Sequence, residues 1–462
     1  MSDPQTIGIA GLAVLFVLLA LRMPVGLAMV LVGVGGNYVL SLAVPYVRFE
    51  PYLKQFKSLL WSNIANYDLS VVPLFILMGF LASQANLSRD LFQGMSALFS
   101  RLRGGIAMAV IGACAGFGAV CGSSLATAST MGRVALPELK RLHYAPRLAT
   151  GTLAAGGTLG ILIPPSVALV IYAVIVEASI IDMFRAAIVP GLLAVIAFVG
   201  VIALQVRLFP EVAPETSVLS RAKRRQALGR LWPVLTIFGA IILGLGIGLF
   251  TPTPAAAAGV FAIAVYGFLF RHGGRGLTFS GLVTALRETA VTAGMIYFIL
   301  FGAEVLKGFF TRAGLPAALS EWAGSSGLDP FVVLALMLVA LILLGCFMES
   351  LAMILVVVPF FWPTLVDLNG GDYVTAATAA YGMGAEELKI WFGILALIVV
   401  ELGLITPPVG LNAFIISSLS KDTPMREIFR GVVPFFSVEL MRVSLIVLIP
   451  GLTLIVPRLL AG

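Results

Sequence analysis

Long apolar runs, separated by short polar or charged stretches, follow one another along almost the whole chain. When roughly 20 apolar residues are taken as one membrane crossing, the pattern predicts ten crossings. They lie near residues 5–21, 24–44, 68–85, 147–177, 184–208, 231–250, 254–270, 287–311, 388–420 and 432–456. We therefore expect an all-α protein that crosses a membrane many times.

Two segments near the start of the chain refine this expectation. The first apolar stretch has no basic region before it and no small-residue cleavage site after it, so we expect a retained helix rather than a signal peptide. Between the second and third crossings, "VRFEPYLKQFKSLLWSNIANYD" (47–68) mixes charged, aromatic and apolar residues. This mixture is typical of an amphipathic helix, and we expect the segment to lie along the membrane surface.

An apolar region at 104–141, "GGIAMAVIGACAGFGAVCGSSLATASTMGRVALPELKR", is interrupted at its middle by small and polar residues. Basic residues flank it on both sides, and such residues favour the cytoplasmic face. We therefore predict a re-entrant hairpin that opens inward, because its interrupted backbone must be buried within the protein. The flanking residues are Arg101, Arg103, Lys140, Arg141 and Arg147, and the predicted tip is Gly122, Ser123 and Ser124.

A second interrupted region, "FVVLALMLVALILLGCFMESLAMILVVVPFFWPTLVD" (331–367), has acidic flanks and no basic residue immediately beside it. By the same rule it opens outward, so the two hairpins have opposite orientation. The flanking acids are Glu321, Asp329, Asp367 and Asp372, and the predicted tip is Met348, Glu349 and Ser350.

The loop charges agree with this topology when both termini face outside. The basic loops 207–230, 271–275 and 421–430 are then cytoplasmic, and the acidic loop that holds Glu177 and Asp182 is external. The topology leaves one group of basic residues outside, against the rule: Arg48, Lys54 and Lys57.

A pair of prolines interrupts one long apolar segment in each half of the chain. "LGILIPPS" (159–166) aligns without a gap with "LGLITPPV" (402–409), and each stretch follows a hairpin. Interior prolines remove a backbone donor and break a helix, and the freed carbonyls need other partners in a membrane. A hairpin followed by a broken helix, repeated with inverted topology, is typical of secondary transporters.

We divide the single integral membrane domain, 1–462, accordingly. The first inverted repeat covers 66–208, with its hairpin at about 105–137 and its broken helix at 147–177. A basic cytoplasmic linker with connecting helices covers 209–286. The second repeat covers 287–456, with its hairpin at about 331–366 and its broken helix at 388–420.

The breaks and tips are candidate binding elements. Unwound carbonyls and half-helix C-termini attract cations, whereas half-helix N-termini attract anions, so one site can hold sodium beside a carboxylate. Serines and small residues also mediate helix packing, and prolines also merely kink helices. Our candidate sodium ligands are Gly122, Ser123, Ser124, Gly160, Pro164, Ser166, Gly345, Glu349, Ser350, Thr406 and Pro407. Our candidate substrate contacts are Ser124, Pro165, Ser166, Thr406, Pro408 and Asn412.

Several of the polar residues at membrane depth have more than one interpretation. Glu401 precedes the second break and could be a structural hydrogen-bond partner, a proton site or an acid that faces the scaffold. Asn412 could contact the substrate or the backbone at a helix start. Glu304 and Lys307 are three residues apart and favour an ordinary ion pair.

Composition excludes several other classes of protein. Hydrophobic residues make up 60% of the 462 residues and charged residues 11%, which no soluble domain approaches. The net charge of +7 comes from short loops, so we expect contact with a lipid bilayer and no nucleic acid. The three cysteines lack metal or disulfide spacing, and the two histidines, His143 and His272, lie in basic loops, away from any serine that could act as a nucleophile. We therefore expect no enzyme, and the two inverted hairpins with broken helices favour alternating access over a passive channel.

Seven stretches in a fixed order resemble one known family. They are "VPLFILMG" (72–79), "GSSLATAS" (122–129), "LGILIPPS", "PGLL" (190–193), "TPTPAAAAG" (251–259), "GCFMES" (345–350) and "ITPPVGLNAF" (405–414). In these stretches the chain is similar to the large membrane subunit, of the DctM or SiaM type, of tripartite ATP-independent periplasmic (TRAP) transporters.

This resemblance implies an inverted-repeat elevator transporter in a bacterial inner membrane, with two or more co-transported sodium ions. It also implies a small four-helix membrane subunit and a periplasmic binding protein that delivers an organic acid. Ser123 and Ser166 match the first sodium site, and Glu349 stands where the family usually has aspartate in the second. Pro254 replaces a family glutamate. The alternative is a stand-alone sodium- or proton-coupled carboxylate transporter of the same superfamily, and the identity of the acid stays open.

Overall fold

The computed structural model describes residues 3–45, 47–214, 220–270 and 276–460. All the regular secondary structure in these residues is helical. The predicted loop 271–275, which holds His272, and residues 215–219 of the predicted linker lie outside the described residues.

The helices up to the middle of the chain contain the first hairpin and the first broken helix. They are α1 (Pro4–Ala20), α2 (Val25–Ala43), α3 (Phe49–Ile64), η1 (Asp68–Ser70), α4 (Val71–Gln84), α5 (Leu87–Leu98), α6 (Gly105–Cys121), α7 (Ser124–Arg141), α8 (Pro146–Leu162), α9 (Val167–Val176), α10 (Ile180–Leu208) and η2 (Pro210–Val212).

The remaining helices contain the second hairpin and the second broken helix. They are α11 (Arg221–Gly229), α12 (Leu231–Gly246), α13 (Pro252–Leu269), α14 (Phe279–Arg312), α15 (Leu315–Ser325), α16 (Pro330–Gly345), α17 (Ser350–Asn369), α18 (Ala385–Gly403), α19 (Leu411–Leu419), α20 (Met425–Leu448) and α21 (Gly451–Leu460).

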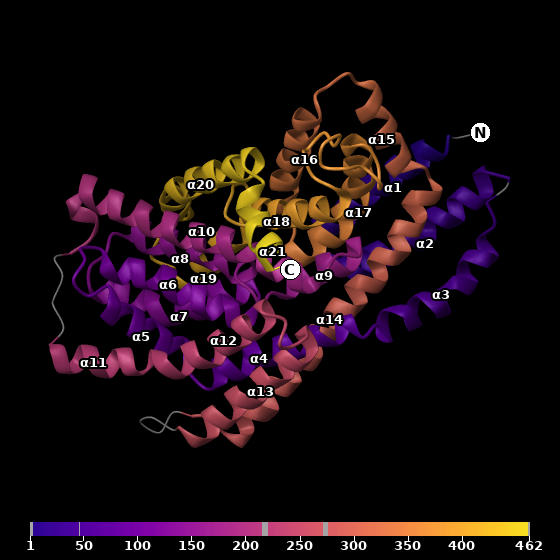
Figure 1. Cartoon of the computed structure of the whole chain (residues 1–462). Helices are drawn as coiled ribbons and strands as arrows, with labels where there is room; N and C mark the ends of the chain where they lie inside the picture. Colours follow the sequence, from indigo (N-terminus) through magenta and orange to yellow (C-terminus); the bar gives the residue numbers. More distant parts are fainter. Residues whose placement is uncertain (1–2, 46, 215–219, 271–275, 461–462) are drawn as a thin grey trace.

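Both predicted hairpins are present. Helices α6 and α7 form the first and lie in the left half of Figure 1, whereas α16 and α17 form the second and lie in the right half. Gly122 ends α6 with φ +58°, a backbone conformation that suits glycine, and the Ser123 hydroxyl then accepts a hydrogen bond from the Ala126 N–H and starts α7. The sequence "CGSS" therefore makes the tight turn at this tip.

Both predicted helix breaks are present as well. The chain bends by 46° between α8 and α9, and residues 163–166 form no helix. In the second half, residues 404–410 separate α18 from α19. The two proline pairs have cis peptide bonds. Since proline donates no backbone hydrogen bond, both breaks fall where the sequence pattern predicts them.

The number of crossings depends on how the bent segments are counted. Among the described residues, seven helices are long and apolar enough to cross a membrane, or up to nine if each bent pair is one span. One of the seven is α17, which belongs to a hairpin. Helix α1 is not among the seven because it is slightly too short. Each of the ten predicted crossings contains a helix or a helix pair, but length and composition alone support fewer than ten.

Two crossings differ in shape from the prediction. The crossing predicted at 68–85 leads at a 69° bend into α5, an amphipathic helix that the apolar pattern did not predict. The crossing predicted at 432–456 is two helices, because Pro450 follows the end of α20. The segment predicted as an amphipathic helix forms α3, and its position relative to the membrane stays a prediction.

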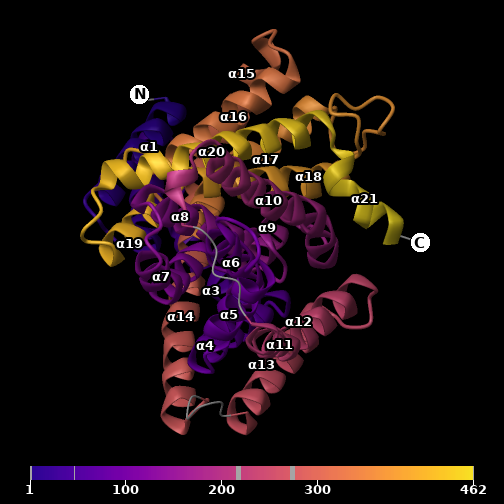
Figure 2. The ribbon, with the colours of Figure 1, turned by 90° about the vertical axis from the view of Figure 1, so that its left-hand side faces the viewer.

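The two halves of the chain interlock. Helix α20 lies across α8 and α10, as Figure 2 shows, and α19 packs against both α7 and α8. In the same way α9 contacts α17 of the second hairpin. The tips and breaks of the two halves therefore meet inside one helical body.

Candidate ion and substrate site

The tip of the first hairpin touches the first helix break through backbone atoms. A Cβ atom on Gly118 would lie 2.4 Å from the Cα atom of Gly160, and one on Gly160 would lie 2.7 Å from the Ser123 carbonyl oxygen. Real Cβ atoms do not approach so closely, so both positions require glycine. Gly160 and Ser123, both predicted sodium ligands, are thus brought together.

The second hairpin meets the second break in the same way. A Cβ atom on Gly403 would lie 2.6 Å from the Cα atom of Gly345. The Gly410 N–H donates to the Cys346 carbonyl, and the Cys346 thiol donates to the Pro407 carbonyl, both at 3.4 Å. Gly403 occupies the place of Gly160 in the alignment of the two proline motifs. Both halves therefore use the same position for the contact of tip with break.

The hairpin tips also have equivalent serines. Ser124 is the first residue of α7 and Ser350 is the first residue of α17, and Ser123 and Glu349 precede them as the N-cap residues. Both serines are buried. The four predicted ligands at the tips therefore form two matched pairs, Ser123 with Glu349 and Ser124 with Ser350. Of the four, only Glu349 is an acid.

Glu401 lies between the two tips. The Ser350 hydroxyl donates to Glu401 Oε1 at 2.6 Å, and the Ser124 side chain lies within reach of the same carboxyl group. Glu401 is 4% exposed, and its Oε2 atom has no hydrogen-bond partner among the described residues. Glu401 is therefore a hydrogen-bond partner of the second tip, and its possible role as a proton site stays a prediction.

The first break is closed and the second is open. Pro164, Pro165 and Ser166 are buried, whereas Pro407 and Pro408 are exposed. Pro164 and Pro165 line a small pocket together with residues of α10 and α12.

The hydroxyl groups at the breaks keep acceptor capacity. The Thr406 hydroxyl donates to the Leu402 carbonyl at 2.5 Å, and the Ser166 hydroxyl accepts from the Leu169 N–H at 3.4 Å. Each hydroxyl oxygen has two lone pairs, so each can still coordinate a cation. Hydroxyl, carboxylate and carbonyl oxygens are the ligands that a hard cation prefers. Among the described residues, no group of histidine, cysteine and acidic side chains could hold a metal of another kind.

Asn412 joins the second break to the first half. It is fully buried, its Nδ2 donates to the Ala154 carbonyl of α8 at 3.5 Å, and its backbone N–H donates to the Leu404 carbonyl at 3.0 Å. Its Oδ1 atom has no partner among the described residues. Asn412 therefore lies between the two halves, and one of its polar atoms has no partner, so its predicted contact with the substrate stays a prediction.

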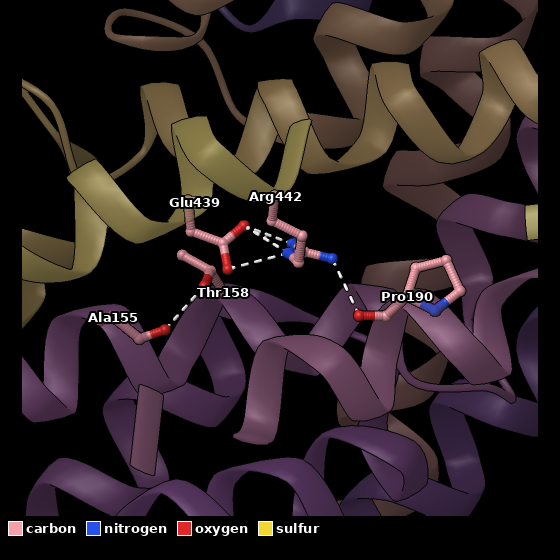
Figure 3. A network of polar contacts seen from close by, with 5 residues as sticks. All are labelled: Ala155, Thr158, Pro190, Glu439 and Arg442. Carbon is pink, nitrogen blue, oxygen red and sulfur yellow. Dashed lines mark hydrogen bonds and ion pairs between the residues drawn. The ribbon is translucent and has the colours of Figure 1, made fainter. Parts of the chain in front are cut away.

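Sequence reasoning missed a buried ion pair behind the site. Figure 3 shows Glu439 and Arg442 of α20 beside Thr158, with Arg442 reaching α10. Arg442 Nε donates to both carboxylate oxygens of Glu439 at 3.1–3.2 Å, and Nη1 donates to the Pro190 carbonyl at 3.0 Å. The signal was present, since an acid and an arginine three residues apart in an apolar crossing predict a buried pair.

The ion pair and Glu401 share one narrow cavity. Thr158, Glu401, Glu439 and Arg442 line it, and its room is about that of one water molecule. Thr158 takes the place of Glu401 in the alignment of the halves, and its hydroxyl donates to the Ala155 carbonyl of its own helix.

Elsewhere, Lys307 and Glu304 lie 3.9 Å apart, which confirms the predicted ion pair.

Comparison with known sequences gives one consistent family. Residues 12–452 match the family described as the tripartite ATP-independent periplasmic transporter, DctM component. The chain is 32% identical over 423 residues to the C4-dicarboxylate TRAP transporter large permease protein DctM of Pseudomonas aeruginosa, covering 91% of this chain and 93% of that protein. It is 29% identical to the sialic acid TRAP transporter large permease protein SiaM of Vibrio cholerae, covering 87% and 88%.

Comparison with solved structures supports the fold. The crystal structure of the Alcanivorax borkumensis YdaH transporter, described as having an unusual topology, matches with a TM-score of 0.60. The match covers 92% of this chain and 97% of that chain at 16% sequence identity. At this identity the likeness concerns the arrangement of helices alone.

Proposed function

Because the chain belongs to the DctM component family of tripartite ATP-independent periplasmic transporters, we propose that it couples sodium entry to the uptake of an organic acid. As a member of this family it is an integral protein of the bacterial inner membrane and a permease rather than an enzyme. A periplasmic binding protein delivers the acid, and a small four-helix membrane subunit completes the transporter. Two relatives are named for C4-dicarboxylates and sialic acid, and both kinds of substrate are acids.

The observation that carries the sodium proposal is the gathering of acidic side chains beside the breaks. Glu349 and Glu439 lie close enough to Glu401 to act on it electrostatically, and Glu439 is paired with Arg442. Among the described residues, Glu349 and Glu401 form no ion pair with a basic side chain. A carboxylate shielded from water is stable as an anion only beside compensating positive charge, and a bound cation supplies it.

Each half contributes one sodium site in this proposal. Ser123, Ser166 and the carbonyls of the first break bind one ion, and Glu349, Thr406 and the Pro407 carbonyl bind the other. Both sites use oxygen ligands at a helix break, where free carbonyls are available.

The substrate carboxylate binds between the two ions. The N-termini of α9 and α19 supply free N–H groups and partial positive charge, and the Asn412 amide adds a side-chain contact. The remaining contacts that we assign to the substrate are Ser124, Pro165, Ser166, Thr406 and Pro408, with the prolines contributing backbone atoms.

Alternating access is of the elevator type, with both hairpins moving as one body. Glu401 is the positioning residue that holds them together, because its carboxyl group takes the Ser350 hydrogen bond and faces Ser124. A single side chain thereby joins equivalent residues of the two repeats.

Replacing Glu401 with methionine is expected to reduce the maximal uptake rate about tenfold or more, because the hydrogen bond to a charged group that fixes Ser350 is lost. The sodium concentration for half-maximal uptake should rise in the same variant. Thr158→Val is the matched control, since Thr158 is the equivalent position and its hydroxyl bonds only within its own helix. Equal effects of the two substitutions on the sodium dependence would show that Glu401 has no positioning role.

Uptake into proteoliposomes that hold the chain and its small-subunit partner tests the proposal. Labelled organic acids are offered with and without an inward sodium gradient, and with and without the cognate binding protein. The proposal requires that uptake depend on both and weaken in Ser123→Ala. Uptake that needs sodium but ignores the binding protein would instead identify the alternative, a stand-alone carboxylate transporter.

A further inference from the structure

A cavity of about 520 Å³ lies where α11 packs against α5, two helices found on the left in Figure 1. The end of the first hairpin forms another wall, through Val134, Glu138 and Arg141 of α7. A cavity of this size suits a small organic ligand or part of a larger one. The transport site uses none of the residues that line it.

Positive charge dominates this cavity. Four basic residues line it: Arg89 of α5, Arg141 of α7, Lys223 of α11, and Arg230 between α11 and α12. Glu138 pairs with Arg141, with Nε to Oε2 at 2.9 Å, and Arg230 lies 3.9 Å from Asp90. Among the described residues, Arg89 and Lys223 form no ion pair, and both are exposed. The cavity therefore has two cations available for an anionic ligand.

The other walls hold apolar side chains beside polar ones such as Ser96 and Gln226. Phe92, Ile106, Val134 and Leu142 line the same space as the four cations. A free inorganic anion uses the cations but gains nothing from the apolar walls. A molecule with an anionic head and an apolar body uses both, because burial of its apolar part is favourable.

Two features near the cavity favour a position at the level of the bilayer headgroups. Trp232, the second residue of α12 and two residues after the lining residue Arg230, is 72% exposed, and tryptophan favours the membrane–water interface. Helix α11 carries the basic run "RAKRR", which the positive-inside rule assigns to the cytoplasm. Basic pockets between helices on that face suit anionic lipid headgroups.

We propose that this cavity binds the phosphate group of an anionic phospholipid from the cytoplasmic leaflet. Arg89 and Lys223 contact the phosphate, Arg141 and Arg230 flank it, and the glycerol and upper acyl carbons lie against Phe92, Ile106 and Leu142. Guanidinium groups suit this role because they bind phosphate oxygens in pairs. The lipid then ties the first hairpin to α5 and α11 at its cytoplasmic end.

Native mass spectrometry of the full chain with its partner subunit tests this site. The complex is loaded with mixed micelles that contain equal amounts of phosphatidylglycerol and phosphatidylcholine and is then washed in mild detergent. The wild type should retain phosphatidylglycerol, and Arg89→Gln/Lys223→Gln should lower the retained fraction about tenfold, since two charged hydrogen bonds are lost.

Arg221→Gln/Arg225→Gln is the matched control, because these two arginines belong to the same helix but do not line the cavity. Retention in this variant should equal that of the wild type. Equal losses in the two double variants, or equal retention of both lipids by the wild type, would overturn the proposal. Displacement of phosphatidylglycerol by excess inorganic phosphate, with phosphate bound in its place, would assign the site to the free ion and overturn the lipid assignment. If the first double variant does not fold, Lys223→Gln alone is compared with Arg225→Gln.

Discussion

Replacing Arg442 with methionine is expected to destabilise the folded chain by about 3–5 kcal/mol, because Glu439 would keep its charge in a buried position without a partner. Both side chains are almost fully buried, and the guanidinium group contacts both carboxylate oxygens as well as the Pro190 carbonyl (Figure 3). The loss is measured as a lower midpoint in denaturant unfolding of the purified chain in detergent.

The double variant Glu439→Met/Arg442→Met is the control for this prediction. Replacing both members of a buried ion pair with apolar residues of similar volume is often close to neutral, so the double variant should regain most of the lost stability. A double variant as unstable as Arg442→Met would contradict the explanation, since the loss would then come from packing or from the contact with Pro190.

Replacing Glu349 with glutamine is expected to lower sodium-driven uptake about a hundredfold, because a charged cation ligand becomes neutral at a buried tip. The shape of the side chain is kept, so α17 should still start at Ser350. The sodium dependence of uptake in proteoliposomes measures the effect. Glu349→Asp is the matched variant, since it keeps the charge and shortens the arm by one carbon.

Uptake by Glu349→Asp should stay within about tenfold of the wild type, because a shorter arm changes ligand geometry but keeps the compensating charge. Wild-type sodium dependence in Glu349→Gln would remove Glu349 from the proposed ligands. Equal loss in both variants would point to the shape of the tip rather than to its charge.

The elements of the site could be predicted from the sequence because each has a local signature. "CGSS" and "CFMES" interrupt apolar runs with residues that turn or cap a helix, and the proline pairs forbid a continuous helix. The gapless match of "LGILIPPS" with "LGLITPPV" also predicted that both halves would use these elements alike. The contacts of Gly160 and Gly403 with the hairpin tips agree with that prediction.

The connections between the elements could not be predicted. Ser350 and Glu401 are separated by 51 residues, and Arg442 and Pro190 by 252, so no periodic pattern links either pair. The first break is buried because α10 and α12 lie beside it, whereas the second is exposed, although both motifs share the proline pair. The basic cavity likewise depends on helices that meet only in the folded chain.

Helix α5 shows a further limit of the pattern. It follows a bend after α4. Its apolar residues lie on one face of the helix and its polar residues on the other, whereas a membrane crossing is apolar all round. The prediction of crossings weighs mean apolarity, so it excludes an amphipathic helix that packs against α6 and α11.

The measurement that tests the central claim most directly follows sodium itself. Entry of ²²Na⁺ into proteoliposomes that hold the chain and its partner subunit is recorded while the organic acid and its binding protein are added. The account predicts that sodium entry accelerates when both are present, in a fixed ratio to the acid taken up, and that Glu349→Gln abolishes the acceleration. Acid uptake with no change in sodium entry would contradict the account.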